Sequence, residues 1–319
     1  MRWLVALVGV LLTLAGTAAI VGQKTSGAQP WSSELSDNIV FAQAIPFAMG
    51  AGVIVGIVMG RAGGRTARRK SDGAIRRFGP GTAMLHWVTS LGLLLALPTG
   101  MWQYLGGILD ATAPIPLYLI YRVHYIGAAL ILFSTAGFLT DWWLTGDRSL
   151  LVPKGQWIGH LRGLAHELPR PVGGALAAVL GLDMKPRAPE AGQFTFYEKV
   201  VSFPTWTFVI ALITITGLVK ALRYVYPVPG PVLFWASTLH VAAMVLIAIK
   251  LLDHIRYTLA RWPLMVSMVT TWVSESYVRV HHPAWWKATE DAEAASVPRP
   301  AGSAAGSAAA AGVAGGPER

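Results

Sequence analysis

Apolar residues gather in six long runs, and most of the charged residues fall between those runs. The runs cover residues 3–21, 39–60, 82–103, 118–143, 203–222 and 232–256. A helix needs about 20 consecutive, mainly apolar residues to cross a bilayer. The pattern therefore predicts an all-α integral membrane protein that crosses the membrane several times.

The first run has two interpretations. Arg2 precedes it and small residues follow it at 16–19, which is typical of a secretory signal peptide cleaved near Ala18 or later, for example after Ala28. The alternative is an uncleaved helix. Residues 1–28 are therefore a signal peptide or a first transmembrane helix, and both readings place residues 22–38 outside the cytoplasm.

Composition narrows the possible chemistry. Charged residues make up 13% of the chain and hydrophobic residues 54%, whereas a soluble domain carries about 25% charged residues. The chain has no cysteine, which excludes disulfides, thiolate-held iron–sulfur clusters, Cys-ligated zinc and covalently attached c-type haem. A redox metal must therefore be held by His, Met, carboxylate or an intact cofactor.

The net charge of +10 points to a membrane surface and not to nucleic acid, because the basic residues lie between the apolar runs. Residues 61–77 are strongly basic, and residues 104–117 contain no Lys or Arg. The positive-inside rule then makes 61–77 cytoplasmic and 104–117 external. We expect a multi-pass protein of the bacterial cytoplasmic membrane, surrounded by lipid, with a cytoplasmic C-terminus.

The remaining segments divide the chain into five parts. They are the signal peptide or first helix (1–28), an extra transmembrane helix with a basic cytoplasmic linker (29–77), a four-helix bundle (78–257), an interfacial cytoplasmic tail (258–290) and an Ala/Gly-rich tail (291–319). The aromatic and basic mixture of 258–290 suits a membrane interface. The low-complexity composition of 291–319 predicts disorder.

Four histidines lie within the predicted bundle helices, where ionisable residues are costly and by default functional. His86 and His254 lie toward the cytoplasmic, or inner, ends of their helices, and His124 and His240 lie toward the outer ends. The spacing from His240 to His254 is about 21 Å along the axis and about 40° short of four full turns, so both face the same way. We therefore expect two b-type haems stacked in the bundle, each held by one inner or one outer pair of histidines.

Charged residues near these histidines have candidate roles. Arg122 and Arg256 are placed to pair with haem propionates at the outer and inner sides. Lys250 lies between His240 and His254, with Asp253 one turn away. A proton-handling role and a structural ion pair both remain open for Lys250 and Asp253. A haem-free transporter or metal-handling protein is the alternative from another class, although the chain shows no inverted repeat.

Four segments carry a resemblance to a known family. They are MLHW (84–87), YRVHYIG (121–127), STLHVAAMVLIAIKLLDH (237–254) and RVHHPAWW (279–286). Together they resemble the cytochrome b gamma subunit of membrane-bound formate dehydrogenase, over roughly residues 78–290. Related di-haem subunits serve NiFe hydrogenases and thiosulfate or polysulfide reductases, so these enzymes remain alternative partners.

The resemblance implies a subunit that anchors an iron–sulfur beta subunit and a molybdenum or tungsten catalytic alpha subunit. Electrons from formate would pass from the outer haem (His124, His240) to the inner haem (His86, His254) and reduce quinone at the cytoplasmic side. The chain would then belong to a formate:quinone oxidoreductase, without formate dehydrogenase activity of its own.

The resemblance also implies a quinone site next to His254. The family's quinone-pocket motif corresponds only in part to residues 192–199, where Thr195, Tyr197 and Glu198 are the quinone-site candidates. His281 and His282 are expected either to pack at the interface or to contact a partner subunit or the quinone pocket. Shorter family members lack the segment 1–77.

Overall fold

A computed structural model describes residues 2–25, 34–62, 73–109, 115–184 and 190–296. The helices are α1 (Arg2–Thr25), α2 (Glu34–Ala62), α3 (Pro80–Ile108), α4 (Leu117–Thr145), α5 (Trp157–Glu167), α6 (Arg170–Val179), the π-helix η1 (Glu198–Ser202), α7 (Phe203–Leu222), α8 (Gly230–Ala260), α9 (Trp262–Thr270), α10 (Glu275–His281) and α11 (Pro283–Ser296). Two short strands, β1 (Ala74–Arg76) and β2 (Trp272–Ser274), complete the described elements.

The all-α membrane prediction is confirmed. Among the described residues, five helices are long and apolar enough to cross a membrane. They cover Asp37–Gly60, Pro80–Ile108, Leu117–Thr145, Glu198–Leu222 and Gly230–Ala260. Helix α1 has a shorter apolar stretch, Leu4–Ala18. The possible cleavage after Ala28 and the basic linker at 63–72 lie outside the described residues.

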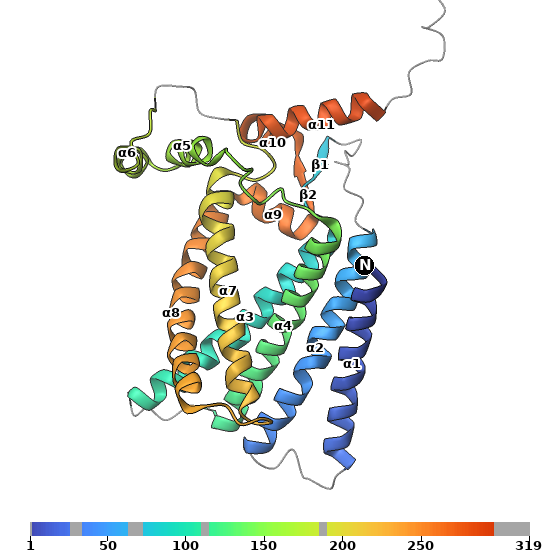
Figure 1. Ribbon diagram of the computed structural model, residues 1–319. Helices are drawn as coiled ribbons and strands as arrows, with labels where there is room; N and C mark the ends of the chain where they lie inside the picture. Colours follow the sequence, from blue (N-terminus) through green and yellow to red (C-terminus); the bar gives the residue numbers. More distant parts are fainter. Residues whose placement is uncertain (1, 26–33, 63–72, 110–114, 185–189, 297–319) are drawn as a thin grey trace, which may run out of the picture.

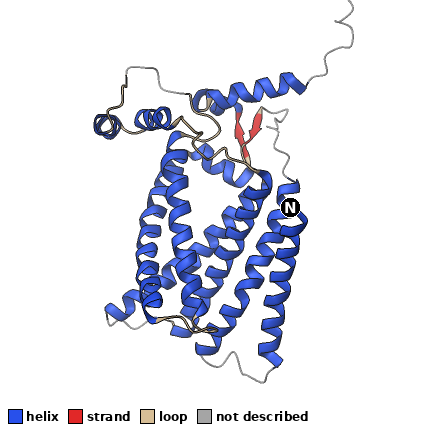
Figure 2. Ribbon diagram, in the orientation of Figure 1, coloured by secondary structure: helices blue, strands red, loops and turns tan. Residues whose placement is uncertain are grey.

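The bundle consists of α3, α4, α7 and α8, with α2 and then α1 packed on the α4 side (Figure 1). Residues from all four bundle helices meet in one apolar cluster at mid-depth, made of Leu93, Ala96, Ile131, Val209 and Ile247. Among the described residues, every regular element apart from the two short strands is helical (Figure 2). The mid-depth cluster separates the inner part of the bundle from its outer part.

Glycines bring α2 close to α4. A Cβ atom on Gly52 would lie 2.1 Å from the carbonyl oxygen of Phe133, and one on Gly56 would lie 2.5 Å from that of Gly137. Small residues spaced one turn apart let membrane helices approach in this way. The extra helix is therefore fitted against the bundle along its length.

The ends of several helices follow local sequence rules. Pro80, Pro231 and Pro263 lie in the first turns of α3, α8 and α9, where a missing N–H leaves no helical hydrogen bond unmade. Helix α4 ends at Thr145 and is capped by Gly146, whose φ of +59° suits glycine. These signals explain why the apolar runs end where they do.

One end of the bundle carries a small folded unit made of β1, β2, α10 and α11 (Figure 1). We call it the inner cap, because it lies at the end that the sequence predicts to be cytoplasmic. Strands β1 and β2 pair antiparallel, with Ile75 opposite Val273. Their side chains pack with Val278 and Trp285. The sequence predicted an interfacial tail but neither the strands nor this small core.

The C-terminal tail differs in part from the expectation of disorder. Residues 291–296 are helical as the end of α11, and the rest of the Ala/Gly-rich segment lies outside the described residues. The helical part contains alanine and glutamate, which are good helix formers.

Candidate functional site

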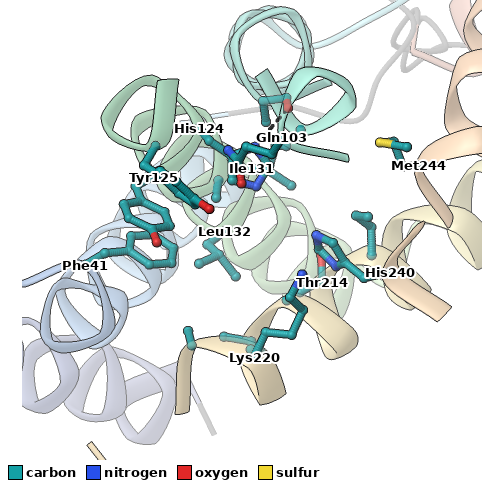
Figure 3. A pocket seen from close by; sticks show the side chains of 18 of the residues that line it. Phe41, Gln103, His124, Tyr125, Ile131, Leu132, Thr214, Lys220, His240 and Met244 are labelled. Atoms are coloured by element: carbon teal, nitrogen blue, oxygen red, sulfur yellow. Dashed lines mark hydrogen bonds between the residues drawn. The ribbon is translucent and has the colours of Figure 1, made fainter. Parts of the chain in front are cut away.

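The outer pair of histidines projects into the bundle from α4 and α8. The ring centres of His124 and His240 are 6.5 Å apart. Figure 3 shows the two rings on opposite sides of a cavity of about 680 Å³. That volume is within the range of cofactor pockets, about 300–1,000 Å³.

Hydrogen bonds fix the orientation of both outer rings. His124 Nδ1 donates to the carbonyl oxygen of Ala96 at 2.9 Å. His240 Nδ1 is 3.0 Å from Thr216 Oγ1, and that hydroxyl donates its own hydrogen to the carbonyl oxygen of Leu212 at 2.6 Å. Each Nδ1 therefore carries the proton, and each Nε2 has the lone pair that a metal needs.

Two glycines leave room beside the outer rings. A Cβ on Gly100 would lie 3.1 Å from His124 Cε1, and a Cβ on Gly217 would lie 3.2 Å from His240 Cε1. Both contacts are tighter than ordinary packing. A flat group held between the rings would use the space that these glycines leave.

The inner pair lies near the capped end of the bundle, on α3 and α8. The ring centres of His86 and His254 are 6.2 Å apart. His86 Nδ1 is buried without a hydrogen-bond partner in the described structure. Trp206 stands edge-on to His254 at 5.7 Å.

Both separations fit a metal ion between two imidazoles. Each metal–nitrogen bond is about 2.0 Å and each ring centre lies about 1 Å further away, which gives about 6 Å between ring centres. Within the described residues, no group of three or more His, Cys, Asp or Glu could hold a metal ion. The two histidine pairs each offer two imidazoles, which would suit haem, a cofactor that supplies the other iron ligands itself.

Arg122 and Arg256 each have a carboxylate partner. Arg122 Nε lies 2.8 Å from Asp37 Oδ2, on the extra helix α2, and its guanidinium also lies over the Tyr118 ring. Arg256 lies 2.8 Å from Asp253 Oδ1 and is largely exposed. The pairing of Arg122 and Arg256 with haem propionates stays a prediction.

Lys250 and Asp253 form the ion pair that was one of the two alternatives, with Nζ 2.9 Å from Oδ2. Tyr197 donates a hydrogen bond to the same carboxylate, and Lys250 Nζ is 3.4 Å from the Tyr197 hydroxyl. Burial raises the pKa of Tyr197 well above its ordinary value. Tyr197, Lys250 and Asp253 thus form a polar network, and Asp253 directly precedes His254 in the sequence.

Thr195 and Glu198 lie in a second polar group beside this network. Thr195 Oγ1 is 2.8 Å from the Tyr257 hydroxyl, and Glu198 is ion-paired with the buried Arg77 at 2.9 Å. Glu198 begins the π-helix η1, a distortion that is frequent at functional sites. The structure thus gathers all four quinone-site candidates near the inner end of α7 and α8.

Sequence reasoning missed several residues that shape the two sites. Arg77 and Glu167 support the segment 195–198, since Glu167 accepts the backbone N–H groups of Phe196 at 3.0 Å and Tyr197 at 2.8 Å. Burial raises the pKa of Glu167, and these two bonds oppose the shift. No spacing in the sequence signals such contacts, because they join segments far apart along the chain.

The tail histidines separate into two environments. His282 is 1% exposed, with Nδ1 2.7 Å from the Gly192 carbonyl oxygen, whereas His281 is exposed and packs on the Tyr277 ring. His282 thus ties the inner cap to the segment that precedes the quinone-site candidates.

The fold and the two pairs define a class: an all-α, multi-pass integral membrane protein with paired imidazoles at two depths. No protein-family model matches the chain. The chain is similar to the formate dehydrogenase cytochrome b556(fdo) subunit of Escherichia coli K12, at 27% identity over 99 residues. The same subunit from strains O6:H1 and O157:H7 matches equally. The match covers 31% of this chain and 46% of the relatives, about half their length.

Proposed function

We propose that the chain is the di-haem b-type membrane subunit of a formate dehydrogenase, delivering electrons from formate oxidation to quinone. The observation that carries the proposal is the pair of ring separations, 6.2 Å and 6.5 Å, at two depths of one bundle. The similarity to a formate dehydrogenase cytochrome subunit supports the same assignment and favours formate over hydrogen or sulfur compounds as the electron source.

The residues of this chain have distinct roles in the proposal. His124 and His240 hold the outer haem, and His86 and His254 hold the inner one. When bound, each haem supplies a one-electron carrier in a dry part of the bundle. Hydrogen bonds to Ala96 and Thr216 keep the outer imidazoles in the ligating tautomer.

Quinone reduction is assigned to the inner end. Thr195, Tyr197 and Glu198, with His254, would line the site of the quinone headgroup. The network of Tyr197, Asp253 and Lys250 offers a proton route beside it, with the proton entering from the cytoplasm. Iron–sulfur and molybdenum or tungsten catalytic subunits are the proposed partners, because the chain is similar to a formate dehydrogenase cytochrome subunit.

The test is a dithionite-reduced minus oxidised spectrum of the purified chain, with haem counted per polypeptide. A b-type α band and two haems per chain are expected. His254→Ala should lose the inner haem and keep the outer one. His240→Ala should lose the outer haem and keep the inner one. His166→Ala, at an exposed histidine of α5, is the matched control and should keep both.

A wild-type chain that folds with adequate haem supply but binds none contradicts the proposal and favours the transporter class. The partner is tested separately by co-purification and by adding formate, hydrogen or a sulfur substrate. Reduction of the cytochrome by formate alone supports the formate assignment.

A further inference from the structure

The outer cavity has an unbalanced charge. Its described lining includes the cationic residues Lys220 and Arg223 but no aspartate or glutamate. The rest of the lining is mainly apolar and aromatic. A partly enclosed, apolar cavity with positive groups and no acid is complementary to an anionic ligand.

Lys220 is the more informative cation. It lies in the last turn of α7, is half-buried, and within the described part of the chain its ammonium has no carboxylate or hydrogen-bond partner. Figure 3 shows its side chain extending along the cavity toward the His240 ring. An unpaired ammonium in a membrane-spanning helix is costly, so a partner that arrives with a ligand would offset that cost.

Arg223 adds a second donor at the mouth of the same cavity. Its guanidinium donates to the Tyr224 hydroxyl at 2.5 Å and is exposed. Arg122, by contrast, is not among the lining residues and is bonded to Asp37. The cations available to a ligand of the outer cavity therefore come from the last turn of α7 and the residue that follows the helix.

We infer that Lys220, with Arg223, binds the two carboxylates of the haem held by His124 and His240. This rests on the proposed function, because b-type haem carries two propionate groups. Lys220 and Arg223 would then take the role that sequence position suggested for Arg122. Lys220 also fixes the direction of the macrocycle, with its propionate edge toward the outer end of α7.

The experiment is a redox titration of the full-length protein, followed in the b-type α band, with haem counted per chain. Lys220→Met should lower the midpoint potential of one haem, since a nearby positive charge favours the reduced state, and should weaken retention of that haem by about tenfold or more. The other haem should keep its potential. The His254→Ala background identifies the affected haem as the outer one.

Two further variants separate binding from a structural role. Lys220→Arg keeps the charge and should restore both potential and haem content, whereas Lys220→Gln should behave as Lys220→Met does. The double variant Asp37→Asn with Arg122→Gln removes the neighbouring ion pair without changing net charge, and should leave both potentials in place.

Unchanged potentials and haem content in Lys220→Met overturn the inference; that result would be expected if Lys220 reaches a lipid phosphate instead. The inference is also overturned if the midpoint potential shifts only in the double variant Asp37→Asn with Arg122→Gln. Failure of the wild-type chain to bind haem is a different result, because it removes the proposed function itself.

Discussion

At the scale of single residues, hydrogen bonds to Nδ1 decide whether a histidine can serve as a ligand. His124 is set by the backbone carbonyl of Ala96, which no substitution removes. His240 is set by the side chain of Thr216, which can be replaced. The two ends of the outer pair therefore differ in how easily they can be tested.

Thr216→Val keeps the shape of the side chain and removes its oxygen. We expect about 10–100-fold weaker retention of the outer haem, because partners of ligating imidazoles typically have effects of this size. Haem release after dilution in detergent measures it. Thr205→Val is the control and should change nothing, because the hydroxyl of this exposed threonine bonds to the backbone carbonyls of Val201 and Ser202 in the adjoining η1.

His282 predicts a pH dependence of the inner cap. Burial lowers its pKa below the ordinary 6.5; the charge of Arg77 acts in the same direction, and the Gly192 carbonyl and Glu198 oppose it. As the pH falls below about 6.5, His282 takes up a proton more readily in the unfolded chain than in the folded one. The stability that a neutral His282 contributes is therefore present above that pH and is lost below it.

Hydrogen exchange of residues 272–289 at pH 7.5 and 5.5 should show smaller protection factors at the lower pH, once the observed rates are divided into the base-catalysed intrinsic rates at each pH. His282→Phe should reduce the pH dependence. His281→Phe, which replaces the exposed neighbouring histidine, should leave the pH dependence unchanged. Equal pH dependence in wild type and His282→Phe would assign the effect to other groups.

At the scale of elements, the glycines of α2 set how closely the extra helix approaches the bundle. Gly52→Leu should destabilise the protein by about 1–3 kcal/mol, the usual range for overpacking, because its side chain would meet the Phe133 carbonyl. Thermal unfolding in detergent measures this. Gly107→Leu is the matched control, since a Cβ there meets nothing within 4 Å.

The helices of the bundle could be predicted from sequence because each is a long apolar run with its own start and stop signals. The grouping of the four histidines by depth was also accessible, since helix geometry fixes axial position and facing. The inner cap could not be predicted from the sequence. β1 and β2 are three residues each, and their pairing depends on a contact between segments that lie far apart along the chain. The role assigned to Lys220 was hidden for a similar reason, because a lysine near a helix end ordinarily reaches the interface.

At the scale of the whole molecule, both ends of the bundle are chemically distinct. The inner end has the cap and the polar network around Asp253, and the outer end has the open cavity with its cations. The two ends of the bundle therefore present different chemical groups to their surroundings.

The orientation in the membrane can be tested because the natural chain has no cysteine. In intact cells, Gly107→Cys should react with a membrane-impermeant maleimide, and Ala288→Cys on α11 should react only after lysis. Both positions are exposed in the isolated chain, and Gly107 lies at the last turn of its span, next to the loop that is predicted to be external. Reaction of each variant after lysis is the control for burial. The opposite pattern would reverse the proposed topology.

The pairing of β1 with β2 has a consequence for how the protein is made. β1 precedes every helix of the bundle in the sequence, and β2 follows all of them. Since a chain is synthesised from its N-terminus and its parts fold in that order, the inner cap cannot close until the last bundle helix has left the ribosome. The bundle therefore remains open on its inner side through most of translation, and closure is a late event of biogenesis. A nascent chain interrupted before Trp272 would contain all five spans found among the described residues but could not form the inner cap.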